Sequence, residues 1–187
     1  MLKVDARNLL SQKRQQLSGT DCVKWDDLIL IQLQKLDWSY THCIGNYYPI
    51  EKHNEPNSLL LAKYLNYIIP DLIITYPVVN KISGTMDFFT ASDEMTTNEW
   101  GIAEPLAEKQ IAHDQIDAFL VPLLGFDLLG HRVGFGKGYY DKYFENCKHP
   151  HKRIGISYFD PIPNIQDTHE FDVPLTHCIT PWNSYEF

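Results

Sequence analysis

Short apolar runs rich in β-branched residues recur along the chain and alternate with longer segments of helical periodicity. Examples are DLIITYPVV (residues 71–79) and IDAFLVPLLGF (116–126), and KRIGISYF (152–159) predicts a further strand. Apolar runs of this length are typical of strands buried on both faces, as in a parallel sheet. Because helical segments separate the runs, the pattern predicts a three-layer α/β/α fold in which helices cover both faces of a mostly parallel central sheet.

The remaining segments predict two helices at the start of the chain, then a βα unit, a hairpin, a strand-loop-helix unit and two further strands. We expect helices at 2–17, 20–36, 56–68 and 139–147, strands at 41–48 and 174–180, and a hairpin at 81–91. Thr20 or Asp21 is placed to cap the second helix. The Ser83-Gly84 turn predicts that the hairpin leaves the sheet. Residues 91–116 are polar and poorly periodic, which indicates an irregular lobe or lid.

Length and composition limit the class of protein. A chain of 187 residues fits a single domain, 1–187, and 44% hydrophobic with 21% charged residues is typical of a folded protein rather than a disordered one. The formal net charge of −8 argues against general nucleic-acid binding. The amino terminus lacks the long apolar core of a signal peptide or membrane span. The four cysteines are widely spaced, which favours free thiols in the cytoplasm, and the histidine spacing predicts no structural zinc.

The segment GFGKGYY (134–140) follows an apolar run and opens a predicted helix. Alternating glycines let backbone amides approach a phosphate, and the helix N-terminus adds positive potential. The spacing fits neither a Walker A loop nor a dinucleotide fingerprint. By itself the segment is compatible with a plain turn as well as with a phosphate site. Asp141 is likewise compatible with an acid in the first turn of a helix that only stabilises the helix. Arg132 and Lys137 favour the phosphate site because they supply charge-assisted donors.

The longer stretch FDLLGHRVGFGKGYYD (126–141) resembles the signature of the 5-formyltetrahydrofolate cyclo-ligase family, roughly FDxxGxRLGxGxGYYD. The family is also called 5,10-methenyltetrahydrofolate synthetase. The likeness extends over most of the chain, and its other matching positions are Lys3, Arg7, Tyr48-Pro49, Glu55, Pro77, Gly101 to Pro105 and Asp172. The chain departs from the family pattern at Ala6, where Leu is usual, at Phe135, where Arg is frequent, and in the NEPNS loop around Glu55.

The resemblance implies an ATP- and Mg2+-dependent cyclisation of 5-formyltetrahydrofolate to 5,10-methenyltetrahydrofolate, with release of ADP and phosphate. The implied fold is related to that of sugar-phosphate isomerases and acyl-CoA transferases. The expected catalytic residues are Lys137, Arg132 and Tyr139, and the expected metal ligands are Asp141 and Asp172. The expected ATP-binding residues are Lys3, Arg7, Arg132, Val133, Gly134, Phe135, Gly136, Lys137, Gly138, Tyr139 and Tyr140. The expected substrate-binding residues are Tyr48, Glu55, Trp100 and Tyr139.

The implied partners are ATP and the folate, with or without a polyglutamate tail, and the protein is expected to act as a monomer without nucleic acid or membrane. The reacting nucleophiles belong to the substrate, so the reaction requires no Ser-His-Asp triad, and the sequence suggests none. Two other functions stay open. A non-catalytic module that binds a phosphorylated metabolite would not need both Asp141 and Asp172, and an isomerase or acyl-CoA transferase would act without ATP.

Overall fold

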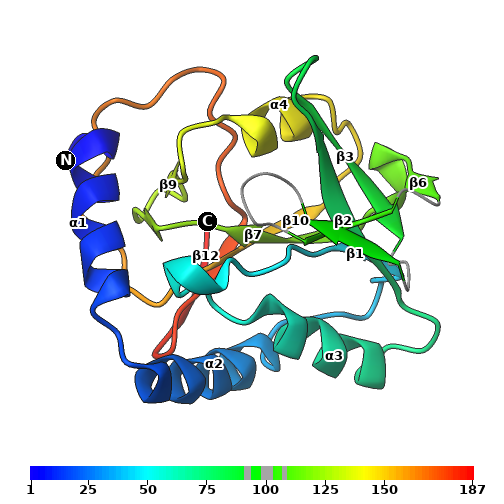
Figure 1. Cartoon of the computed structure of the whole chain (residues 1–187), viewed down its shortest axis with the longest axis horizontal. Coiled ribbons are helices and arrows are strands. Elements are labelled where there is room, and N and C mark those ends of the chain that lie inside the picture. Colours follow the sequence, from blue (N-terminus) through cyan, green and yellow to red (C-terminus); the bar gives the residue numbers. More distant parts are fainter. Residues whose placement is uncertain (91–93, 98–102, 107–108) are drawn as a thin grey trace.

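An eight-stranded mixed sheet forms the centre of the protein, with helices on both faces (Figure 1). The computed structural model describes residues 1–90, 94–97, 103–106 and 109–187. The helices are α1 (Lys3–Gln15), α2 (Gly19–Leu33), α3 (Ser58–Ile68) and α4 (Tyr139–Glu145), with 3-10 turns η1 (Glu51–His53) and η2 (His113–Gln115). The strands are β1 (Cys43–Gly45), β2 (Ile73–Asn80), β3 (Thr85–Thr90), β4 (Met95–Thr97), β5 (Ala103–Pro105), β6 (Gln110–Ile111), β7 (Ala118–Pro122), β8 (Gly125–Phe126), β9 (Arg132–Val133), β10 (Lys152–Ile156), β11 (His177–Ile179) and β12 (Ser184–Glu186).

The order of the strands contains a topological switch point. The sheet runs β12-β11-β10-β7-β1-β2-β3-β6, and β2, β1, β7, β10 and β11 are mutually parallel. The chain first moves outward from β1 to β2 and later returns to β7 on the other side of β1. In open α/β sheets a ligand crevice forms at such a reversal, outside the carboxyl ends of the strands. The predicted three-layer, mostly parallel fold is therefore confirmed, and the topology points to the ends of β1 and β7.

Alternating side chains of β7 divide the core between the two faces of the sheet. Ala118 and Leu120 join the cluster under α2 and α3, whereas Phe119 and Val121 join the cluster under α4. All four side chains are at most 1% exposed, as expected for a strand covered on both faces. Figure 1 shows α2 and α3 along one face, α4 on the other, and α1 beside β9. No helix in the described part of the chain has the length and apolar character needed to span a membrane.

Three local expectations were wrong. The predicted hairpin does not leave the sheet, because β3 pairs antiparallel with β2 along six residues and then with β6. Helix α2 is capped by Ser18 in place of Thr20 or Asp21. The Ser18 hydroxyl accepts a hydrogen bond from the Asp21 amide, and the Asp21 carboxylate accepts one from the Ser18 amide, which together form a capping box. The edge strand β12 and the hairpin β8–β9 were not expected, and residues 94–97 and 103–106 include two short paired strands rather than only irregular chain.

The β8–β9 hairpin carries the glycine-rich segment and is fixed by the buried carboxylate of Asp127. The Asp127 oxygens accept hydrogen bonds from the amides of Leu129, His131 and Ile165, each at 3.0 Å, and one of them lies 3.2 Å from Nδ1 of the His131 ring. Burial alone would raise the pKa of Asp127, but these bonds outweigh it and hold the pKa below its ordinary 3.8. The ionised form is therefore favoured by folding.

Asp127→Asn is expected to lower the free energy of unfolding by about 1.5–3 kcal/mol at pH 7, because one acceptor oxygen is lost. The contribution of a carboxyl with a depressed pKa is present above its unfolded-state value and disappears as the pH falls through the folded-state value. Urea unfolding of both proteins should therefore give stabilities that converge below pH 3.8. A difference that stays constant across this range would contradict a role for the charge.

Candidate active site

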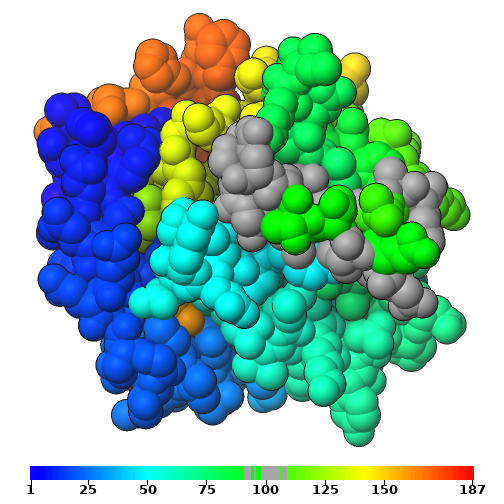
Figure 2. Space-filling model, viewed as in Figure 1, coloured from blue at the N-terminus to red at the C-terminus, as the bar shows by residue number. Residues whose placement is uncertain are grey.

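A pocket of about 630 Å³ lies at the carboxyl ends of β1 and β7, where the strand order reverses. Tyr47 and Tyr48 follow β1, Pro122 ends β7, and Pro77 belongs to β2. Helix α1 and the glycine-rich segment close the remaining sides. Figure 2 shows α1 in blue, the chain around residue 50 in cyan and the glycine-rich region in yellow-green meeting on one face. The pocket thus brings together α1 and the glycine-rich segment, two parts of the chain that carry the family resemblance.

Almost every residue predicted for the site lines this pocket. The predicted residues found there are Lys3, Arg7, Tyr48, Glu55, Arg132, Gly134, Phe135, Gly136, Lys137, Gly138, Tyr139, Tyr140, Asp141 and Asp172. Val133 is fully buried, and its side chain packs with Ala6 and Leu10 instead. Trp100 lies outside the described residues. Helix α1 and the glycine-rich segment thus share one cavity, as the predicted site required.

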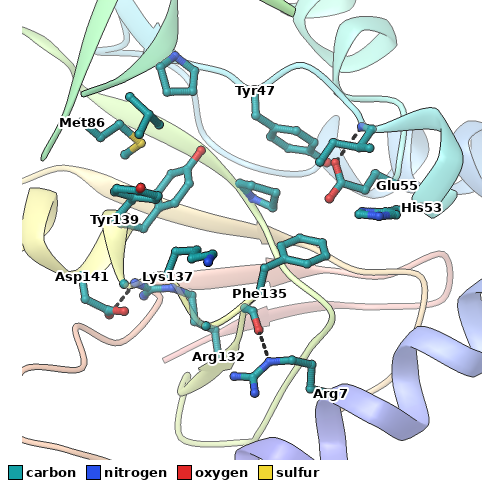
Figure 3. Close-up of a pocket in the computed structure, with 18 of the residues that line it drawn as sticks. Arg7, Tyr47, His53, Glu55, Met86, Arg132, Phe135, Lys137, Tyr139 and Asp141 are labelled. Atoms are coloured by element: carbon teal, nitrogen blue, oxygen red, sulfur yellow. Dashed lines mark hydrogen bonds and ion pairs between the residues drawn. The ribbon is translucent and has the colours of Figure 1, made fainter. Parts of the chain in front are cut away.

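The glycine-rich segment reaches α1 through Arg7. The Arg7 Nε atom donates a 2.9 Å hydrogen bond to the carbonyl of Gly134 (Figure 3). Gly136 has φ +86°, a backbone conformation that favours glycine, and a Cβ there would lie 3.3 Å from Arg7 Nη2. Gly138, at φ +70°, is the N-cap of α4. The segment is therefore held against a cationic side chain in a glycine-dependent conformation.

Two ion pairs occupy the same wall of the pocket. Arg132 Nη2 donates to Asp141 Oδ1 at 2.5 Å, and Lys3 Nζ donates to Asp172 Oδ2 at 2.5 Å. Arg132 also donates to the Val173 carbonyl, and burial lowers the pKa of its guanidinium against the opposing effect of Asp141. Lys137 forms no ion pair within the described part of the chain. This wall can therefore offer a further positive charge to an anionic ligand.

Asp141 and Asp172 are the carboxylates of this wall that are available to a divalent cation. Asp141 Oδ1 and Asp172 Oδ2 take the hydrogen bonds, whereas the second oxygen of each accepts none from the described residues. Burial raises the pKa of Asp172, but the bonds from Lys3 and the His169 amide outweigh this effect and lower it overall. Mg2+ commonly uses one or two carboxylates and completes its shell with phosphates and water. A protein-only cluster of three or more His, Cys, Asp or Glu ligands is absent from the described residues.

The opposite side of the pocket is aromatic and ends at a buried carboxylate. Glu55 is 8% exposed, and its Oε2 accepts a 2.8 Å bond from the Ile50 amide. Burial raises the pKa of Glu55, although the Ile50 bond and the charge of Arg14 act in the other direction. Tyr48 stacks on Tyr76 with ring centroids 4.1 Å apart. This side is suited to a flat ring that presents hydrogen-bond donors.

Sequence reasoning missed several lining residues, among them Tyr47, His53, Val79 and Met86. Tyr47 and Val79 stand next to or near predicted positions, and their place at a strand end is the signal that could have found them. His53 stacks on Phe135 with ring centroids 5.6 Å apart. That contact joins segments more than 80 positions apart, so no spacing in the sequence indicates it.

The fold and the site define an α/β protein whose pocket places a cationic, glycine-rich wall opposite an aromatic recess with a buried carboxylate. Comparison with known proteins then identifies the family. The chain belongs to the 5-formyltetrahydrofolate cyclo-ligase family, whose model matches residues 2–181. The resemblance noted in the sequence is confirmed.

Individual relatives agree with this assignment. The 5-formyltetrahydrofolate cyclo-ligase of Mycoplasma genitalium is 30% identical over 120 residues, which cover 59% of this chain and 73% of the relative. A solved 5,10-methenyltetrahydrofolate synthetase from Mycoplasma pneumoniae superposes with a TM-score of 0.77 at 28% identity, covering 97% of this chain and 99% of that one. The synthetase of Aquifex aeolicus gives a TM-score of 0.80 at 24% identity, covering 100% and 93%, which supports the fold.

Proposed function

We propose that this protein converts 5-formyltetrahydrofolate to 5,10-methenyltetrahydrofolate with hydrolysis of ATP to ADP and phosphate. The observation that supports this most directly is the shared cavity. Lys3 and Arg7 of α1 line the same pocket as the glycine-rich segment, and Glu55 lies across from them. A phosphoryl donor and a folate need such adjoining positions for direct transfer between them.

In this reaction the formyl oxygen attacks the γ-phosphorus of ATP, and the bond from that phosphorus to the bridging oxygen breaks to release ADP. The N10 lone pair then attacks the activated formyl carbon. Phosphate departs with the electrons of its carbon–oxygen bond, and the N10 proton is lost. The protein's contribution is to align the two substrates and to stabilise the charge on the phosphoryl oxygens. Lys137, Arg132, Tyr139 and the backbone amides of residues 134–139 are the groups we propose for this role, and these residues line the pocket, whereas the intervening Val133 is buried.

Asp141 and Asp172 would hold Mg2+ through their second oxygens, together with the nucleotide phosphates. When bound, the ion supplies Lewis-acid stabilisation of phosphoryl charge. Arg132 and Lys3 keep both carboxylates in place by the 2.5 Å bonds. The arrangement positions the acids without requiring a rigid all-protein metal cage.

The decisive test is to mix the protein with 5-formyltetrahydrofolate and Mg-ATP and to follow the absorbance of the methenyl product. We expect product only when ATP is present. Binding of ATP or folate without turnover would favour the non-catalytic module, and turnover of a sugar phosphate or an acyl-CoA without ATP would favour the related enzymes.

The protein is further proposed to act as a monomer in the cytoplasm. Lys3, Glu55 and Lys137 of a single chain line one pocket, which supports a site built by one copy. The four cysteines are free, which suits a reducing compartment. Light scattering coupled to size-exclusion chromatography should give a mass near 21.7 kDa.

Glu55→Gln is expected to raise the KM for 5-formyltetrahydrofolate roughly 10- to 100-fold and to leave the KM for ATP within about twofold. The charge-assisted bond between a buried carboxylate and a ligand donor is worth about 1.5–3 kcal/mol. Steady-state kinetics with each substrate varied in turn separates the two constants. Glu51→Gln, an exposed change in η1, is the matched control, and an equal rise in the KM for ATP would contradict the assignment of Glu55 to the folate.

A further inference from the structure

Arg14, in the last turn of α1, is an arginine that the proposed chemistry does not use. Its side chain is almost completely buried, and it is not among the described residues that line the pocket. Along α1 it follows Lys3 by eleven residues and Arg7 by seven, and both of those residues line the cavity. A buried guanidinium is costly unless several partners satisfy it, so its position needs an explanation.

Three pocket-forming segments converge on the Arg14 guanidinium. Its Nη1 atom donates a 3.1 Å bond to the Leu123 carbonyl, which follows β7. Its Nη2 atom lies 3.9 Å from Glu55 Oε1, and both side chains are less than 5% exposed. Its Cζ atom lies 5.6 Å from the ring centroid of Phe135 in the glycine-rich segment. The same residue also accepts a 3.0 Å bond from Asn54 Nδ2 at its backbone carbonyl.

These contacts bear on the orientation of Glu55. The Ile50 amide fixes Oε2, whereas Oε1 accepts no hydrogen bond from the described residues and faces Arg14 as an ion pair. Oε1 is therefore the oxygen whose hydrogen-bonding capacity the described residues leave unused. Figure 3 shows Glu55 and His53 on the side of the pocket opposite Asp141 and Arg132, with Phe135 between them.

We propose that Arg14 is a positioning residue that orients Glu55 for the folate. The inference rests on the proposed function, because it requires Glu55 to contact the folate. Arg14 acts from behind the pocket wall. The hydrogen bond to the Leu123 carbonyl anchors its guanidinium, Nη2 pairs with Glu55, and the face of the guanidinium lies over the Phe135 ring. Consistent with this role, the charge of Arg14 opposes the effect of burial on the Glu55 pKa and so favours the ionised carboxylate.

A purely structural arginine would predict something different. If Arg14 only satisfied the Leu123 carbonyl and filled space, its replacement would weaken the whole site and affect both substrates. If Arg14 acts through Glu55, its replacement should affect the folate selectively, and the effect should vanish once Glu55 has lost its charge. A double-mutant cycle separates these two roles.

The cycle compares the wild type, Arg14→Met, Glu55→Gln and the double variant, with the KM for 5-formyltetrahydrofolate and for ATP measured for each. Arg14→Met should raise the folate KM about tenfold in the wild-type background and less than twofold in the Glu55→Gln background. The KM for ATP should stay within twofold throughout. Lys13→Met, an exposed change in the same turn, is the matched control and should change neither constant.

Arg14→Lys provides a second arm that keeps the charge in case the methionine variant does not fold. Lysine cannot bond Leu123 and pair with Glu55 as a planar fork, so we expect a folate KM raised about three- to fivefold, again suppressed by Glu55→Gln. Equal effects in both backgrounds, an equal rise in the KM for ATP, or no effect on the folate KM would overturn the inference. Absence of ATP-dependent methenyl formation by the wild type would instead refute the proposed function, so the two failures are distinguishable.

Discussion

Replacing Lys137 with alanine should lower kcat by about 100- to 1,000-fold, the loss typical when one preorganised electrostatic group is removed from a reaction centre. Lys137 stands between Gly136 and Gly138, and Figure 3 shows its side chain reaching toward the middle of the pocket. Unlike Arg132 and Lys3, it has no ion-pair partner within the described part of the chain. Its charge is therefore available to the transferring phosphoryl group.

The measurement is the initial rate of methenyl formation at saturating folate and Mg-ATP, together with a thermal unfolding curve. The exposed side chain should contribute little to stability, so the midpoint of unfolding should stay close to that of the wild type. Lys148→Ala, at an exposed position beyond α4, is the control and should retain full activity. A Lys137→Ala enzyme with normal kcat would show that another group stabilises the phosphoryl charge.

The central part of the fold was predictable because burial on both faces leaves a direct mark on the sequence. β7 is apolar at every position and buried at nearly all of them, as a doubly covered strand requires, whereas β2 and β10 are apolar and buried over only part of their length. The edge strands lack such a run of consecutive apolar residues. β6 and β12 have two and three residues, and their pairing depends on neighbours brought close by the rest of the sheet. The Ser18 cap was missed because Thr20 and Asp21 are equally good capping residues in isolation.

The site was predictable only in part from residue chemistry. The glycines, Arg132 and Lys137 indicate a phosphate site, yet nothing in their spacing shows that Lys3 and Arg7 share it, since more than 120 positions intervene. That expectation came from the family resemblance, and the common pocket agrees with it. Arg14 shows the limit of sequence reasoning. Its helical spacing places it near Lys3 and Arg7, but only the packing of the loop before α3 and the end of β7 makes it buried.

Asp141→Asn should raise the magnesium concentration needed for half-maximal activity at least about tenfold and lower kcat/KM for Mg-ATP roughly 100-fold. Asparagine keeps one oxygen for Arg132 and for the Val173 amide, both of which now bond to Asp141 Oδ1. It removes the negative charge and the second carboxylate oxygen, which is the one proposed for the metal. Loss of a charged metal ligand commonly costs this much in affinity or activity.

A loss of folding stability caused by Asp141→Asn can be separated from a loss of magnesium binding. Arg132 is only 8% exposed at its side chain, so its incomplete neutralisation should cost about 1–3 kcal/mol of unfolding free energy, which urea unfolding measures directly. Glu145→Gln, an exposed change one turn further along α4, is the control for altered helix charge and should leave the magnesium dependence unchanged. If excess magnesium failed to recover any of the lost rate while the protein remained folded, Asp141 would act through Arg132 alone. The second oxygen would then have no ligand role, because a weakened metal site must respond to metal concentration whereas a misplaced guanidinium does not.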